Sequence, residues 1–314
     1  MYINQLIIEG VGGIQYLNLN FNRQMNLICG PNGIGKTTIL EVIAHIFSAG
    51  SSNILKRNVN AEIGRINAQI INNGEEQIVE IILETFVPEV ATQIHSGLHQ
   101  LSSGVISLKT NRIFQYQALK AVGKDSRKSD NILWSDAING INLNEIKNWF
   151  VHRYLYSAHE GALRPEQLAN YDLAKSCFSL LNEQFQFSKV DGSSNEIMVY
   201  TPDGEIYYEY LSSGFKSIIS ILFGIIKEIE LRFVDPRIKA IDFEGIILID
   251  EIELHLHPEW QQKIVEVLIR AFPKAQFFST THSPHVIQVA EPRQIIALGS
   301  DFQKVIQREL PDSE

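Results

Sequence analysis

The sequence predicts an α/β fold with a mixed or parallel sheet flanked by helices, N-terminal antiparallel strands and a helical insertion. Three observations lead to this prediction. Short runs that alternate apolar and polar residues fill the N-terminal third, as in half-buried strands. The last third alternates continuous apolar strands with helices, which is typical of a parallel sheet covered on both faces. The polar residues between these regions have no clear periodicity.

The N-terminal third is expected to form several strands and one helix. The expected strands are Ile3–Glu9, Ile14–Phe21, Met25–Cys29, Ile66–Ile71 and Gln77–Phe86. A helix is expected over Lys36–Phe47, and Gly50 is a suitable residue after its end. The run Asn72-Asn73-Gly74 between the last two strands is typical of a hairpin turn.

Residues 90–165 are polar and mixed, and we interpret them as an insertion or helical lobe that could bind a partner. Residues 1–89 and 166–314 would then form one domain, which we call the head. Between Lys109 and Lys128 lie six basic residues and one acidic residue, so this stretch is a possible nucleic-acid contact, a docking surface, or a solvated helical face. A short strand is expected at Arg153–Tyr156.

The last third has the clearest pattern of alternating elements. In order, the expected elements are helix Gly214–Phe233, strand Gly245–Asp250, helix Pro258–Phe272, strand Gln276–Thr280, helix His285–Ala290 and strand Gln294–Leu298. Proline suits the first turn of a helix, because the N–H that it lacks has no partner there.

Composition excludes several classes of protein. The 36 acidic and 27 basic residues give a net charge of −9, which argues against general wrapping in nucleic acid. Two cysteines, Cys29 and Cys177, cannot form a disulfide framework, so we expect a reducing, cytoplasmic location. The longest apolar stretch, Ile218–Ile226, is far shorter than the roughly 20 residues that cross a bilayer, and no signal peptide is recognisable. We therefore expect no membrane association.

A glycine-rich segment between a strand and a helix fits the pattern G-x-x-x-x-G-K-[ST]. Its glycines allow backbone N–H groups to point into one concavity, and the following helix N-terminus adds partial positive charge. The lysine suits the β and γ phosphates of ATP, and the Thr37 hydroxyl suits Mg²⁺. The expected nucleotide contacts are Gly30, Asn32, Gly33, Gly35, Lys36, Thr37 and Thr38. A chance glycine turn is disfavoured because the flanking elements agree with the motif.

The strand Ile246–Ile249 ends in two carboxylates, Asp250 and Glu251. A strand buried on both faces delivers them to the carboxyl edge of the sheet, where open α/β sheets bind ligands. Asp250 is then expected to reach Mg²⁺ or its water shell, and Glu251 to act on water beside the γ phosphate. A solvated acidic turn is the alternative.

The order of these motifs resembles that of the ABC-type ATPases. Leu211-Ser-Ser-Gly214 stands where that family has its signature motif, between the glycine-rich segment and the Asp250-Glu251 strand. Four strings are more specifically similar to the RecF, SMC and OLD-nuclease branch: Leu6-Ile-Ile-Glu-Gly-Val-Gly-Gly-Ile14, Cys29-Gly-Pro-Asn-Gly-Ile-Gly-Lys-Thr37, Asp250-Glu-Ile-Glu-Leu-His-Leu-His-Pro258 and Phe278-Ser-Thr-Thr-His-Ser-Pro284. The resemblance implies a P-loop ABC-type ATPase head.

The resemblance also implies an ATP-sandwiched homodimer, or a higher homo-oligomer. In such families the segment Ser212, Ser213 and Gly214 closes on the γ phosphate bound by a second chain, while Glu251 and Lys36 are catalytic. His282 resembles the switch histidine that senses the γ phosphate. The alternatives are a helix cap at Ser212–Gly214 and a turn histidine at position 282.

Some positions depart from the family pattern. Phe215 replaces the glutamine that transport ATPases carry, and the glutamine loop has three candidates: Gln115, Gln117 and the segment Ser157–Gly161. His255 and His257 beside Glu253 suggest a zinc site, which we discount because no third histidine or cysteine lies at ligand spacing.

The spacing of the motifs limits the subfamilies that the chain can resemble. The 173 positions from Thr38 to Leu211 are too few for the coiled-coil arms of SMC proteins, and 32 residues after His282 leave no room for a Toprim nuclease domain. The chain thus resembles stand-alone defence ATPases of the PtuA type. We expect it to hydrolyse ATP and to regulate a separately encoded nuclease or toxin in bacterial anti-phage defence. A RecF-like DNA-repair ATPase is the main alternative, and a transporter subunit is a weaker one.

Overall fold

A six-stranded sheet forms the centre of the molecule. The computed structural model describes the backbone of residues 1–112, 116, 118–301 and 304–308, and side chains as far as Gly299. The sheet has the order β15-β14-β3-β13-β12-β8, and its strands are β3 (Met25–Cys29), β8 (Val105–Leu108), β12 (Ile246–Ile249), β13 (Gln276–Thr281), β14 (Ile295–Asp301) and β15 (Lys304–Arg308). Every pairing is parallel except that of β14 with β15. The expected α/β sheet is therefore present.

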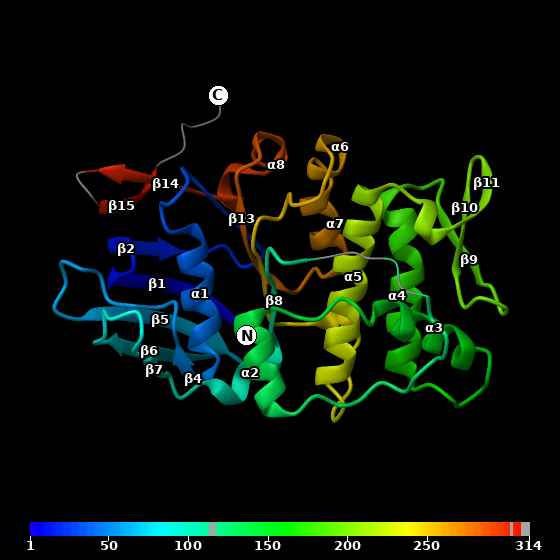
Figure 1. Ribbon diagram of the computed structural model, residues 1–314, viewed down its shortest axis with the longest axis horizontal. Helices are drawn as coiled ribbons and strands as arrows, with labels where there is room; N and C mark the ends of the chain where they lie inside the picture. The colour runs from blue at the N-terminus through cyan, green and yellow to red at the C-terminus, as the bar shows by residue number, and fades with distance from the viewer. Residues whose placement is uncertain (113–115, 117, 302–303, 309–314) are drawn as a thin grey trace.

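A second, antiparallel sheet covers one side of the head. Its order is β2-β1-β5-β6, with strands β1 (Tyr2–Val11), β2 (Ile14–Asn20), β5 (Gly64–Asn72) and β6 (Glu75–Leu83). Asn73 and Gly74 have φ values of 52° and 84°, as the tight hairpin turn between β5 and β6 requires. Helix α1 (Lys36–Ile46) lies between this sheet and the central one (Figure 1).

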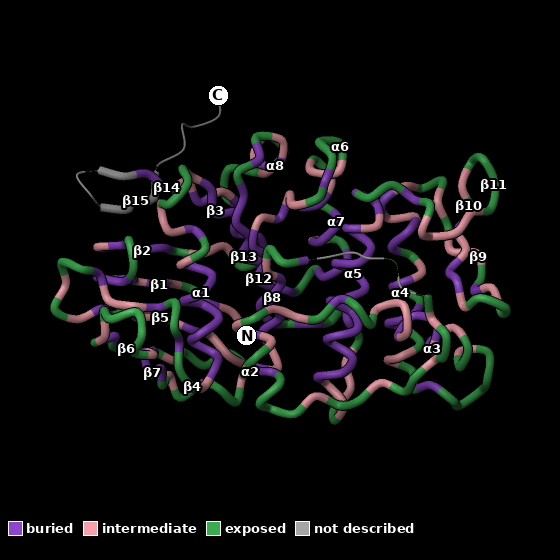
Figure 2. The backbone as a smooth tube through the Cα atoms, viewed as in Figure 1, coloured by how far each residue is buried: buried purple, intermediate pink, exposed green. Residues whose placement is uncertain are grey.

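The other side of the central sheet is covered by helices (Figure 1). They are α3 (Ile146–Ser157), α4 (Pro165–Leu181), α5 (Ser213–Arg232) and α7 (Ile264–Ala271). Helix α5 is buried along almost its whole length (Figure 2), so its Ile- and Phe-rich sequence forms the centre of this second core. The remaining elements are β4 (Ala49–Ser52), β7 (Thr92–His95), α2 (Asp130–Asn139), β9 (Gln186–Val190), β10 (Ile197–Thr201), β11 (Gly204–Tyr207), α6 (Pro258–Gln261) and α8 (Pro284–Val289).

Several elements differ from the prediction, and three of the differences bear on the site or its surroundings. Arg153–Tyr156 is not a strand but part of α3, because Trp149, Phe150 and Arg153 are buried at helical spacing. The single helix expected over Pro258–Phe272 is divided into α6 and α7. Strand β8 was not expected; it lies within residues 90–165 and yet pairs with β12 in the central sheet. No helix of the described chain is long and apolar enough to span a membrane.

Candidate nucleotide site

Four chain segments meet at the carboxyl edge of the central sheet. They follow β3, β8, β12 and β13, which are parallel neighbours. The carboxyl edge of such a sheet is where ligands of open α/β folds bind. The sheet thus gathers the glycine-rich loop, Asp250-Glu251, the end of β13 with His282 and, unexpectedly, Arg112.

The loop after β3 has the backbone that phosphate binding needs. Gly30 has a φ of 151°, and a Cβ there would lie 2.7 Å from the carbonyl oxygen of Leu298. Gly33 has a φ of 76°, with no other group within 4 Å of its Cβ position, so the loop is open where a phosphate would enter. The Lys36 ammonium donates to the carbonyl oxygens of Gly30 and Pro31, both at 2.9 Å. Burial lowers the pKa of Lys36, and the ammonium has only these neutral acceptors within the described chain.

Asp250 and Thr37 bring together two oxygen ligands of the kind that Mg²⁺ prefers. The Thr37 hydroxyl lies 3.3 Å from Oδ1 and 3.4 Å from Oδ2 of Asp250, which is almost buried. Thr280 donates to Oδ1 at 2.6 Å and so orients the carboxylate. Within the described residues no group of three His, Cys, Asp or Glu side chains could hold a metal alone. The fit is therefore to a cation that takes its other ligands from phosphate and water.

Glu251 is held by its backbone, while its carboxylate makes no hydrogen bond to a described residue. It has a φ of 48°, unusual for a residue other than glycine. Its N–H donates to the Thr280 hydroxyl at 2.7 Å, and its carbonyl oxygen accepts from Arg112 at 2.7 Å. A strained backbone fixed from both sides leaves the side chain available for water or substrate.

Arg112 is the residue of this site that sequence reasoning missed. It was counted in the basic stretch, yet its side chain is 4% exposed and also donates to the Asp250 carbonyl oxygen at 3.0 Å. Burial lowers its pKa to about 10, so it remains a cation at neutral pH. Arg112 reaches this edge because β8, which ends at Leu108, pairs with β12.

His282 is exposed at the end of β13, close to the acidic strand end. Its backbone N–H donates to Glu253 Oε1 at 2.6 Å, which ties the turn to the segment after Glu251. Ser283 caps α8 by accepting from the N–H groups of His285 and Val286. The turn is thus held by its backbone, and the imidazole of His282 is turned toward solvent.

The segment Ser212–Gly214 begins α5. Ser212 Oγ accepts from the Phe215 N–H at 3.3 Å, so the helix cap that was the alternative interpretation exists. Both serines remain exposed, while a Cβ at Gly214 would come within 2.6 Å of the Trp260 ring. No hydrogen bond within the described chain joins this segment to the glycine-rich loop, and Figure 1 shows α1 and α5 on opposite sides of the central sheet.

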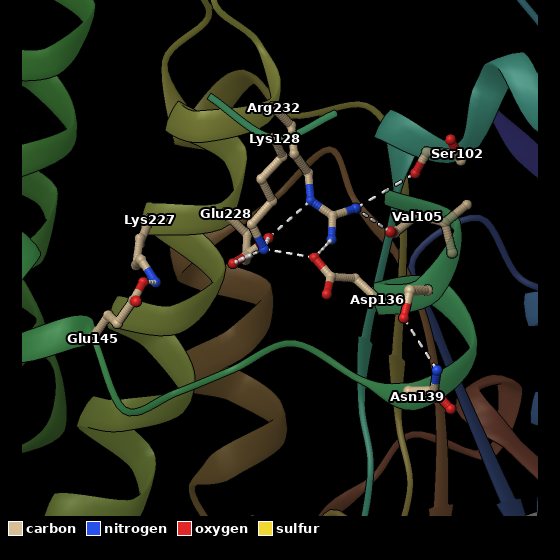
Figure 3. A network of polar contacts seen from close by, with 10 residues as sticks. Ser102, Val105, Lys128, Asp136, Asn139, Glu145, Lys227, Glu228 and Arg232 are labelled. Atoms are coloured by element: carbon tan, nitrogen blue, oxygen red, sulfur yellow. Dashed lines mark hydrogen bonds and ion pairs between the residues drawn. The ribbon is translucent and has the colours of Figure 1, made fainter. Parts of the chain in front are cut away.

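The basic stretch from Lys109 to Lys128 is not one surface. Lys109 pairs with buried Glu41 at 2.6 Å, and Arg112 belongs to the site above. Lys128 is bound to Glu228 and Asp136 in a closed polar network (Figure 3). Three of its six cations are therefore engaged inside the protein. The glutamine-loop candidates Gln115 and Gln117 lie outside the described residues, and Ser157–Gly161 begins at the last residue of α3 and continues into the exposed turn after it.

Comparisons with known proteins agree with this geometry. An AAA domain family matches residues 5–171, and an AAA ATPase domain family matches residues 161–287. The Septu protein PtuA of Bacillus thuringiensis is 45% identical over 317 aligned residues, covering 99% of this chain and 80% of that protein. The retron Ec83 probable ATPase of Escherichia coli is 32% identical over 174 residues, which are 51% of this chain and 32% of that protein.

A solved structure supports the fold. The SMC head domain from Thermotoga maritima superposes with a TM-score of 0.54 over 99% of both chains, at 15% sequence identity. At that identity the likeness concerns the fold alone, and it confirms the predicted P-loop head with its parallel sheet and N-terminal antiparallel strands.

Proposed function

The chain belongs to the family of the Septu protein PtuA and is an ATPase, and from this we propose that its ATP hydrolysis controls a separately encoded effector in anti-phage defence. The effector class that we propose is a nuclease or toxin. ATP hydrolysis is supported by one observation: four residues lie together at one edge of the sheet, namely Lys36, Thr37, Asp250 and Glu251.

Each residue at this edge has a proposed role. The glycine-rich loop and Lys36 bind the phosphates of ATP, and Thr37 and Asp250 hold Mg²⁺. When bound, the metal offsets phosphate charge. Glu251 orients water for in-line attack and accepts its proton. We assign His282 to the γ phosphate because its exposed ring follows β13, next to the strand that precedes the loop.

A second chain completes the site in this proposal. Ser212 and Ser213 are exposed at the start of α5, so their hydroxyls and the first N–H groups of the helix can meet an anion from outside. The cap formed by Ser212 uses one N–H of that turn and leaves others available. The arrangement suits a head-to-tail sandwich of two ATP molecules between two chains.

Mixing two inactive variants tests the shared site. Lys36→Ala removes the phosphate-binding ammonium, and Ser213→Arg blocks the exposed helix start without touching the loop. Each variant alone should lack ATPase activity, while the mixture should recover part of it, because one intact composite site forms in each mixed dimer. A mixture as inactive as its components would contradict the sandwich. Undiminished ATP binding by Lys36→Ala would instead contradict the phosphate-loop assignment.

The effector proposal needs a separate experiment. Tagged Glu251→Gln protein, purified from its host with ATP and Mg²⁺, should have the mass of a dimer plus a second protein. Recovery of a bare dimer with DNA alone would favour the RecF-like repair ATPase. That alternative has less support, because only Lys120, Lys124 and Arg127 of the basic stretch remain outside the interior contacts described above.

A further inference from the structure

A charged cavity lies on the helical side of the molecule, outside the nucleotide site. It has a volume of about 890 Å³ and is bounded by α3, the start of α4, the end of α5 and the segment around Arg127. Lys124, Arg127 and Arg237 line it, and the side chain of none of the three makes a hydrogen bond or ion pair with another described residue. Lys124 and Arg127 are exposed and Arg237 is half-buried. These cations are available to a ligand.

The floor of the cavity contains acidic side chains that are paired with Arg153. Glu230 of α5 is 3% exposed and accepts from Arg153 Nε at 2.6 Å and from Trp149 Nε1 at 3.3 Å. Asp125 pairs with Arg153 at 2.9 Å. The cavity therefore holds four cations and two carboxylates, an excess of positive charge in a protein whose net charge is −9. Such an excess in a concave site favours an anion.

The segment that carries the cations is anchored next to them. Lys128 binds both Glu228 oxygens at 2.7 Å and Asp136 at 2.5 Å, which fastens the chain to α5 and α2 (Figure 3). Arg127 directly precedes this anchor. Its backbone position is thus fixed by a buried cluster, although its side chain faces the cavity and solvent.

One wall of the cavity is aromatic. The rings of His152 and Tyr156, one turn apart on α3, are stacked with centroids 4.5 Å apart. Tyr156 is 45% exposed, so its ring can accept a further aromatic partner. An aromatic face beside unpaired guanidinium and ammonium groups matches a ligand that has both a planar base and a phosphate.

We propose that this cavity binds a nucleoside phosphate, with the phosphate on Lys124, Arg127 and Arg237 and the base against Tyr156. The ligand is either a free nucleotide or the 5′-phosphorylated end of a nucleic-acid strand. It contacts Leu231 and Glu230 near the end of α5, whose 20 residues run about 30 Å to Ser213. The cavity therefore borders the far end of the helix that begins with Ser212–Gly214.

The binding test uses the Lys36→Ala full-length chain, so that the glycine-rich loop does not compete. AMP, a 5′-phosphorylated decamer of deoxyadenosine and the same decamer with a 5′-hydroxyl are titrated by calorimetry. Binding of AMP identifies a free nucleotide, and binding of the phosphorylated decamer alone identifies a strand end; both support the proposal. Equal binding of the two decamers without binding of AMP, or no binding of any of the three ligands, overturns it.

Variants decide whether the ligand sits in this cavity. Arg127→Glu and Arg237→Glu should each weaken binding at least about tenfold, because each removes a charged contact and adds repulsion. Tyr156→Ala should weaken it as well. Lys120→Glu is the matched control, since this exposed lysine lies in the same segment but does not line the cavity. If Arg127→Glu and Lys120→Glu behave alike while both keep wild-type melting temperatures, the cavity is not the binding site.

Discussion

Two groups of charged residues in this molecule use their bonding capacity very differently. In the cluster of Figure 3, Glu228 and Asp136 face Lys128 and Arg232, and Arg232 Nε binds Glu228 at 3.0 Å. At the carboxyl edge of the sheet, Lys36 donates to two carbonyl oxygens. Among the described residues it forms no ion pair with Asp250 or Glu251. Those groups are held by hydroxyls and backbone instead.

The difference distinguishes charged residues that stabilise the fold from charged residues that can bind ligands. Charges that neutralise one another in the interior fasten α2, α5 and the segment before α2, and have little left for a ligand. Charges held by neutral groups keep their charge and their free lone pairs for phosphate, metal and water. Changes at the two places should therefore alter different measurements, and the following predictions test that separation.

The largest effect is expected from Glu251→Gln. Loss of the carboxylate should lower kcat about 10²- to 10⁴-fold, the usual contribution of a positioned general base, and leave ATP affinity and thermal stability unchanged. Steady-state ATPase assays and calorimetry measure this. Glu259→Gln is the control, because its side chain is 66% exposed. Normal turnover in Glu251→Gln would move the catalytic role to another residue.

Glu228→Gln should show the opposite behaviour. The change leaves Lys128 and Arg232 with Asp136 as their one remaining carboxylate among the described residues, and breaking a buried pair of this kind costs about 3–5 kcal/mol of unfolding free energy. Urea unfolding measures this loss, and ATPase activity per folded molecule should stay near wild type. Glu266→Gln is a matched control, since it removes another i,i+4 Arg–Glu pair that is exposed. Equal losses in the two variants would show that burial does not matter here.

Arg112→Met tests a residue that is buried like the first group but contacts the backbone of the second. The carbonyl oxygens of Asp250 and Glu251 would each lose the hydrogen bond from Arg112, although Glu251 keeps the one from the Leu254 N–H; the loss should cost about 1–3 kcal/mol. If this displaces Glu251, kcat should fall about 10- to 100-fold while ATP affinity changes little. Arg112→Lys should restore part of kcat, because an ammonium can still reach one carbonyl. Lower stability with wild-type kcat would make Arg112 a purely structural residue.

The smallest effect is expected at His45, which is buried beside Glu41, the partner of Lys109. Its Nδ1 lies 2.7 Å from the Glu41 carbonyl oxygen, while Nε2 is buried without a partner, and burial lowers the pKa of the ring. As pH falls below about 6.5 the unfolded chain takes up the proton first, so unfolding free energy should decrease, by at most about 1.4 kcal/mol per pH unit. Urea unfolding between pH 7.5 and 5.5 should show a steeper loss for wild type than for His45→Gln. Parallel losses would mean that His45 titrates alike in both states.

Much of the fold and of the candidate site could be predicted because the relevant patterns are local. β3 was predicted with its observed bounds, and α1 and α5 to within one residue at each end. The glycine-rich loop needs only left-handed glycines, a strand before it and a helix after it. The cap at Ser212 needs only the N–H groups of its own turn.

Other features could not be predicted, because they depend on segments distant in the chain. The basic stretch from Lys109 to Lys128 reads as one surface, but its charges find partners as far away as Glu41, Glu228 and the carbonyl of Glu251. Strand β8 is four residues long and is defined by its pairing with β12. Arg153 can be buried in α3 because its cation is paired with Glu230, 77 positions later.

The sequence by itself determined the phosphate loop, the acidic strand end and the order of the parallel strands' motifs, since backbone conformation and hydrogen bonding within about ten residues specify them. Only the tertiary structure decided which cations became internal counter-ions, which one holds the backbone of Glu251, and which remained to line a cavity. The physical reason is that the free energy of a charge depends on burial and on its nearest partners, and both are set when distant segments pack together.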